Sequence, residues 1–342
     1  GARAHARAES AALSARARAL RAPGGAAPLA SDDGAAAAAA AARAGPWAPA
    51  GTVPSVWFAA IEAGVQGDSN PALDSVDLLA GEPGLRLQAA TWGGWRPLRG
   101  RHGALETSAA LFQSYYPAPR PALAPYDVTG GRVALAGALS AGPLALRAEG
   151  SARDLWTGLG RTHFATTFGL TLDGALSLAS DRVRLRAVGA AAATDFVDVS
   201  PPDAAASPAN RDAVHLLARA GVELALGRGF GAEAWGEFET DLAEGDDFDW
   251  RGGGGGLGLR KRAASRAWWR PAEGELLIDV SLRDYPHRTD DRRDVRIAVA
   301  GRAGWRAGPG SVTAEVTYFR SVSIAAYDYT RLAGGLGYRV DF

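Results

Sequence analysis

The chain has 342 residues, no cysteine, no methionine, and 37 basic residues balanced by 37 acidic ones. These counts exclude disulfides, cysteine-based zinc sites and thiol catalysis, and the zero net charge argues against a broad electrostatic surface for nucleic acid. No apolar run approaches the roughly 18 residues of a membrane-spanning helix, because the alanine run over residues 35–42 is too short. A helical membrane protein is therefore excluded. Since even an initiator methionine is missing, we expect Gly1 to follow a segment that was removed.

The first 53 residues differ in composition from the remainder. Residues 4–22 combine strong helix formers with arginines three or four positions apart. The alanine run follows Ser31, Asp32 and Asp33, which are residue types that cap helices. We predict a helical arm over residues 1–53, and a low-complexity linker with partial helicity is the alternative.

From Pro54 onward the apolar residues alternate with a period of two. Between Asp212 and Leu226 the even positions are apolar, whereas the odd ones include His215, Arg219 and Glu223. The same alternation marks fourteen segments, centred near residues 61, 90, 109, 134, 148, 168, 186, 218, 236, 255, 278, 299, 316 and 335. The sequence therefore predicts an all-β domain over residues 54–342.

The connections between these segments alternate in length. Short ones cover residues 97–102, 140–142, 227–229 and 307–310, whereas long polar or proline-rich ones cover residues 68–83, 116–125 and 197–211. An even strand number with short turns at one end and longer loops at the other is typical of a transmembrane antiparallel β-barrel. A soluble sandwich or propeller also alternates and is the structural alternative.

Aromatic residues support the barrel, because tryptophan and tyrosine favour the boundary between water and lipid. One predicted girdle shares the apolar face near the short turns and consists of Trp57, Trp95, Trp268, Trp305 and Tyr338. A second lies near the opposite rim, where some members are expected to point inward, and consists of Tyr115, Trp156, Phe248, Trp250, Tyr285 and Tyr327.

The last segment alternates up to a terminal phenylalanine. Leu332, Leu336, Tyr338, Val340 and Phe342 share one face. This pattern resembles the closing strand of Gram-negative outer-membrane proteins. The resemblance implies a fourteen-stranded outer-membrane β-barrel with a periplasmic arm, and recognition of the strand ending in Phe342 by the outer-membrane assembly machinery.

A second resemblance rests on Gly64-Val65-Gln66-Gly67-Asp68-Ser69-Asn70 and on Tyr327-Asp328-Tyr329. These segments are similar to barrels that follow tetratricopeptide repeats, as in surface lipoprotein assembly modifiers and exopolysaccharide exporters. The chain departs from that group because no complete repeat precedes Pro54.

If the apolar residues face lipid, the charged residues of each strand face the lumen. The candidate pore-lining residues are Arg132, Arg147, Arg153, Arg182, Arg184, Arg186, Arg219, Glu233, Glu237, Glu239, Glu275 and Asp279. Arginine dominates the fourth to eighth segments and carboxylates dominate the ninth and eleventh, which predicts opposed walls and a transverse field. A salt-bridge lattice that fills the barrel is the alternative.

Glycines 252–256 interrupt the tenth segment, which indicates a bend or the close approach of another segment, such as the N-terminal arm acting as a plug. A phosphate-binding loop is the sharper alternative, but the Gly-Lys-Ser/Thr that such a loop requires does not follow.

No constellation of nucleophile, base and orienting group stands out among the five histidines and the carboxylates, so we expect neither an enzyme nor a cofactor or metal. The predicted function is an outer-membrane channel for passage or export of polar or anionic solutes or polysaccharide. The alternative is a non-conducting scaffold that anchors an envelope complex or assists surface lipoprotein export. The expected partners are outer-membrane lipid, the assembly machinery and an envelope protein bound through the arm.

Overall fold

The computed structural model describes residues 56–69, 83–100, 102–117, 127–157, 162–178, 182–196, 212–246, 248–262, 273–288, 290–324 and 328–342. The predicted arm over residues 1–53 lies outside these ranges, as do Trp268, Tyr327 and most residues of the three long connections.

Alternating sequence becomes strand at each of the fourteen predicted positions. The strands are β1 (Trp57–Asp68), β2 (Gly84–Arg99), β3 (Gly103–Tyr115), β4 (Val128–Ala141), β5 (Leu144–Thr157), β6 (Thr162–Leu178), β7 (Val183–Phe196), β8 (Ala213–Gly227), β9 (Phe230–Ala243), β10 (Trp250–Arg262), β11 (Glu273–Asp284), β12 (Arg293–Ala307), β13 (Gly310–Val322) and β14 (Tyr329–Asp341). Each predicted centre falls inside its strand, so the all-β prediction is confirmed.

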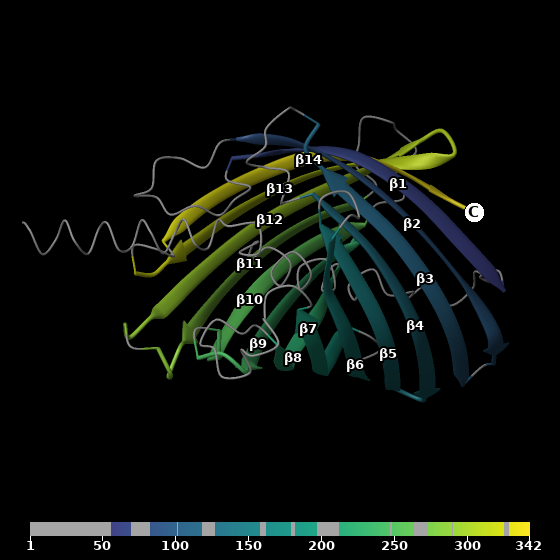
Figure 1. The fold of residues 1–342 in the computed structure, drawn as a ribbon. Coiled ribbons are helices and arrows are strands. Elements are labelled where there is room, and N and C mark those ends of the chain that lie inside the picture. Colours follow the sequence, from purple (N-terminus) through teal and green to yellow (C-terminus); the bar gives the residue numbers. More distant parts are fainter. Residues whose placement is uncertain are drawn as a thin grey trace, which may run out of the picture.

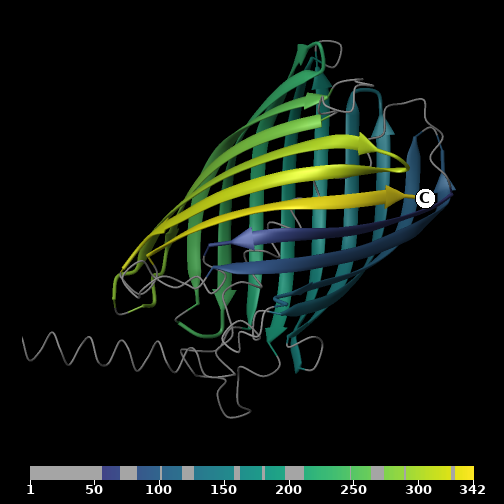
Figure 2. The same ribbon diagram turned by 90° about the horizontal axis from the view of Figure 1, so that it is seen from above.

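The strands form one closed antiparallel barrel in which each pairs with its neighbours in the chain (Figure 1). Closure comes from β1 and β14, which lie side by side and pair from Ala60 opposite Asp341 to Asp68 opposite Ala333 (Figure 2). Beyond the last ladder pair, the Phe342 amide donates to the Ala59 carbonyl at 2.8 Å. The barrel therefore has no free sheet edge, which satisfies backbone groups in a medium without water.

The two faces of the wall differ in polarity, as the period of two requires. Large apolar side chains at alternate positions are exposed on the outside, for example Leu170 at 52 % and Leu336 at 57 %. A soluble protein does not expose a continuous apolar belt of this kind, whereas a barrel in lipid must. The wall is therefore that of a membrane barrel, and the sandwich and propeller alternatives are wrong. Among the described residues, no helix is long and apolar enough to cross a membrane.

The short connections are tight turns at one end of the barrel. Gly142 and Gly308 adopt positive φ angles of 57° each, a backbone conformation that glycine adopts without steric cost. Short turns mark the periplasmic end of an outer-membrane barrel, so the opposite rim of the described strands is the outer one.

In the aromatic girdle near the short turns, Trp57, Trp95 and Tyr338 are exposed as predicted, whereas Trp305 is half-buried. Trp57 on β1 stacks on Trp95 of β2 with ring centroids 5.5 Å apart, and Tyr338 is also exposed. In the second girdle, Trp250 and Tyr285 are each only 6 % exposed, so they are members that do not face lipid, as was expected of some of them.

Candidate functional site: the charged inner wall

The predicted pore-lining residues lie on the inner face. Eleven of the twelve belong to strands at positions that alternate with outward apolar residues, and Arg182 directly precedes β7. Antiparallel pairing brings them into rows, such as Arg147 opposite Asp173 and Arg219 opposite Glu237. The strand assignment therefore places the candidate residues as a charged lining of the lumen.

Arg132, Arg147 and Arg186 of β4 to β7 are paired with carboxylates of the same or the adjoining strand. Arg186 contacts Asp173 of β6 through two nitrogens, at 3.0 Å and 2.6 Å. Glu149 on β5 accepts from Arg147 at 2.6 Å and also from Arg132 of β4. These charge-assisted hydrogen bonds hold neighbouring strands together and neutralise part of the arginine-rich sector.

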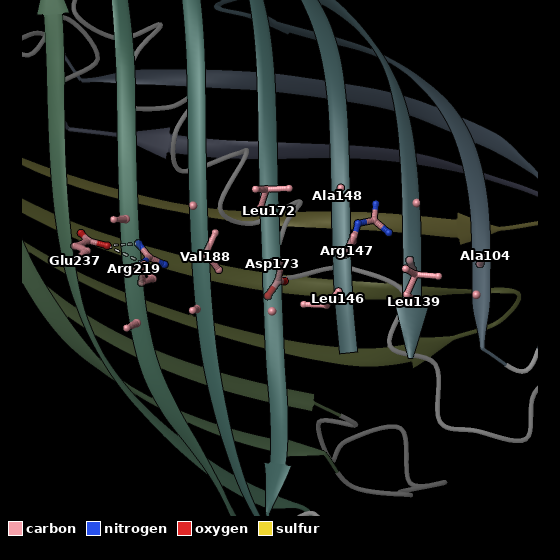
Figure 3. Close-up of a pocket in the computed structure, with 18 of the residues that line it drawn as sticks. Ala104, Leu139, Leu146, Arg147, Ala148, Leu172, Asp173, Val188, Arg219 and Glu237 are labelled. Carbon is pink, nitrogen blue, oxygen red and sulfur yellow. Dashed lines mark hydrogen bonds and ion pairs between the residues drawn. The ribbon is translucent and has the colours of Figure 1, made fainter. Parts of the chain in front are cut away.

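The arginine-rich and acidic sectors meet between β8 and β9. Arg219 donates through Nε to Glu237 at 2.7 Å, a pair drawn in Figure 3. Because β9 adjoins β8 in the closed order, the acidic strands lie beside the arginine-rich wall. The prediction of opposed walls is therefore wrong, since strands consecutive in sequence are also neighbours in the barrel.

Two ion pairs skip a strand, and each crosses a glycine. Arg283 of β11 reaches Glu239 of β9 at 3.4 Å over Gly252, which is the ladder partner of both residues. Arg260 of β10 reaches Glu223 of β8 at 3.2 Å and passes close to Gly231 of β9.

The glycine run of β10 has a local structural reason. Gly252, Gly254, Gly256 and Gly258 alternate on the inner face, so between residues 252 and 258 this strand presents no side chain there. A Cβ at Gly256 would collide with the indole of Trp235, which leans across from β9. The predicted close approach is thus made by a neighbouring side chain, and because the run lies within a regular strand the phosphate-loop alternative is wrong. A plug formed by the arm lies outside the described residues.

The ion pairs follow the wall. Within the described strands, each ion pair named above joins residues on the same strand or on strands at most two apart. The salt bridges named above therefore line the wall, and none of them crosses the barrel to the far side.

A second cluster lies at the outer rim, where sequence reasoning named no site. Asp294 is 1 % exposed and accepts hydrogen bonds from Arg292 at 2.9 Å and 2.6 Å, from the Tyr285 hydroxyl at 3.1 Å and from Ser323. These contacts join residues near β11, β12 and β13. The only sequence signal for the cluster is the presence of aspartates at loop ends.

Two further aspartates at this rim have shifted acidities. Burial raises the pKa of Asp127 above its ordinary value, although the Tyr116 amide donates to its carboxylate at 2.8 Å. A hydrogen bond from Arg288 lowers the pKa of Asp290, with Arg288 Nε 2.9 Å from the carboxylate. Both residues hold loop ends rather than lining the lumen.

The outer surface carries an apolar groove of about 1260 Å³ across β3 to β9 (Figure 3). Its floor consists of outward-facing small residues such as Gly189 and Ala218, and larger side chains such as Leu146, Leu172 and Phe238 border it. Arg147, Asp173, Arg219 and Glu237 of the charged inner wall also belong to the residues that line this groove (Figure 3).

The closed wall, the apolar exterior, the girdle and the charged inner face together define an outer-membrane β-barrel of fourteen antiparallel strands, of the kind found in Gram-negative bacteria.

Comparison with protein-family models and with curated proteins finds no match. Among solved structures, the chain is similar to OmpT, an outer membrane protein of Vibrio cholerae, with 8 % identity, a TM-score of 0.47, and coverage of 86 % of this chain and 100 % of that one. An outer membrane channel from Pseudomonas putida F1 is 11 % identical with a TM-score of 0.46, and the match covers 86 % of this chain and 99 % of that one. The CymD monoaromatic hydrocarbon channel is 9 % identical with a TM-score of 0.46, and the match covers 85 % of this chain and 89 % of that one. At these scores the likeness carries no argument of its own, and the barrel assignment rests on this chain's strand pairing.

Proposed function

We propose that the barrel is an outer-membrane channel for polar solutes, including anions and saccharides that carry anionic groups. The observation that carries this proposal is the inner wall, where the ion pairs of Arg132, Arg186, Arg219 and Arg283 run along the wall. Charges satisfied in this way cost little to keep in a polar lumen and offer successive weak contacts to a passing solute.

The arginine-rich sector supports the anionic part of the proposal. On the inner face of β4 to β8, with the turn before β7, seven arginines accompany three carboxylates, which are Glu149, Asp173 and Glu223. An excess of guanidinium groups along one side of a pore attracts anions without trapping them, provided that most are paired.

The test is conductance of the refolded full-length chain in planar bilayers, with folding checked by the heat-dependent gel mobility of closed barrels. We expect discrete current steps, and a reversal potential in a salt gradient that indicates preference for anions. A folded protein without current would refute the channel. Current with a cation preference would refute the anionic part alone.

The resemblance to barrels that follow tetratricopeptide repeats stays a prediction, as does the alternative of a scaffold anchored through residues 1–53. Deletion of residues 1–53 distinguishes the channel from the scaffold. A channel retains its conductance after this deletion, whereas an arm-mediated scaffold loses its envelope partner in co-purification.

A further inference from the structure

Two pairs of like charges lie directly opposite each other on the inner wall. Arg132 of β4 is the ladder partner of Arg153 of β5, and Glu223 of β8 is the ladder partner of Glu233 of β9. Like charges at opposed positions of an antiparallel ladder destabilise it, so each pair requires counter-charges.

The acidic pair is supplied with counter-charges by the protein. Glu223 has Arg260 at 3.2 Å, Arg184 at 3.8 Å and Arg186 at 3.9 Å. Three guanidinium groups around this carboxylate explain its position without any bound molecule. Two of these groups, Arg184 and Arg186, belong to the row of arginines at positions 182, 184 and 186. Because they share Glu223, this row does not offer an anion unshared donors.

The basic pair is not supplied in the same way. Glu149 contacts Arg132, but it is shared with Arg147 at 2.6 Å. Within the described residues, Arg153 contacts no carboxylate, and its charged neighbour is Arg132. Three guanidinium groups therefore accompany one carboxylate, which leaves two positive charges uncompensated on this part of the wall.

Hydroxyl groups flank the same position. Thr167 of β6 is the ladder partner of Arg153, and its hydroxyl lies 3.1 Å from that of Thr194 on β7. Guanidinium groups present parallel N–H donors that match the oxygens of phosphate, sulfate and carboxylate. The half-buried Arg153 therefore faces a second arginine and a threonine hydroxyl, which together offer hydrogen-bond donors but no negatively charged acceptor.

We propose that Arg132, Arg153 and Thr167 form an oxyanion-binding subsite on the inner wall, which takes the phosphate, sulfate or carboxylate group of a solute. The subsite rests on the proposed channel for its physiological role, although its binding chemistry does not require current. It narrows the solute class from polar and anionic molecules in general to those that carry an oxyanion group.

The first experiment is calorimetric titration of inorganic phosphate into the full-length barrel folded in detergent, in chloride buffer. We compare the native chain with Arg153→Gln, which removes one guanidinium and leaves no carboxylate without its partner. The matched control is Arg302→Gln, because Arg302 also faces inward but has Glu275 and Glu315 as its ladder partners. Heat-dependent gel mobility verifies that each variant is closed.

We expect the native chain and the Arg302→Gln variant to bind phosphate equally, and Arg153→Gln to bind about tenfold more weakly, as the loss of a charged hydrogen bond predicts. Equal weakening in both variants, or no phosphate binding by the native chain, would overturn the subsite.

The second experiment separates the subsite from the channel. In planar bilayers, phosphate should reduce the chloride current, and the half-blocking concentration should rise about tenfold in Arg153→Gln. Phosphate binding by a folded but silent barrel would leave the subsite in place and refute the channel. Current that phosphate reduces equally in the native chain and in Arg153→Gln would leave the channel in place and refute the subsite.

Discussion

A buried ion pair bridges the seam between β1 and β14, in addition to the backbone ladder. Asp68, the last residue of β1, has a side chain with 0 % exposure, and Arg331 of β14 is 13 % exposed. Arg331 Nε lies 3.1 Å and 3.0 Å from the two carboxylate oxygens, and a second guanidinium nitrogen lies at 2.6 Å. Because 263 positions separate the partners in the chain, this pair stabilises ring closure directly.

Asp68→Asn removes the charge and one acceptor while keeping the side-chain size. Removing one partner of a buried pair leaves an uncompensated charge and costs about 3–5 kcal/mol. The control is Asp341→Asn, because Asp341 is 62 % exposed and pairs with Arg339 of the same strand. An exposed pair contributes only about 0.2–1 kcal/mol, so this variant should unfold almost as the native chain does.

The assay is urea unfolding of the barrel in lipid vesicles, followed by tryptophan fluorescence. The expected result is a clearly lower unfolding midpoint for Asp68→Asn and little change for Asp341→Asn, with similar slopes for all three proteins. Equal midpoints for the two variants would refute the assignment of the seam to the buried pair.

Three further predictions follow from the wall and the rim. Gly256→Ala should lower the yield of closed barrel on a heat-modifiability gel, whereas Gly137→Ala, with open space around its Cβ, should not. Leu170→Arg should destabilise the barrel in vesicles by about 2–4 kcal/mol if residue 170 lies near the membrane midplane, and the inward Thr171→Arg by much less. Because the pKa of Asp127 is raised on folding, its stabilising contribution is present below the unfolded pKa and is lost as pH rises through the folded pKa. Unfolding of Asp127→Asn measured against pH should lack that decline.

Strand number and facing could be predicted from the sequence because both follow from a local alternation. Alternate side chains of each strand face lipid and the polar lumen. The direction of a residue such as Leu170 or Arg219 can therefore be predicted from the polarity of its neighbours in sequence. The tight turns carry a comparable local signal, as at Gly142. Neither inference requires knowledge of which strand lies beside which.

The partner of each charged residue could not be predicted, because pairing depends on register and on closure. The link from Asp68 to Arg331 exists only once the first and last strands meet. The prediction that the acidic strands face the arginine-rich strands was based on the number of charged residues in each strand. Those numbers do not say which strands lie across the lumen from one another. The outer-rim cluster around Asp294 was missed in part for the same reason, since Ser323 follows β13 whereas Tyr285 and Arg292 belong to the β11–β12 hairpin.

The glycine run of β10 depends both on the local sequence pattern and on the register of the neighbouring strands. A glycine signals missing side-chain volume, and register decides which side chain uses that volume. Here Trp235 takes the space beside Gly256, and Arg283 crosses Gly252 to reach Glu239. The ion pair between Arg283 and Glu239 therefore runs along the wall. Since most charges are satisfied in this way, the uncompensated position at Arg153 is distinct on the inner face, and this contrast makes it the most informative residue to change.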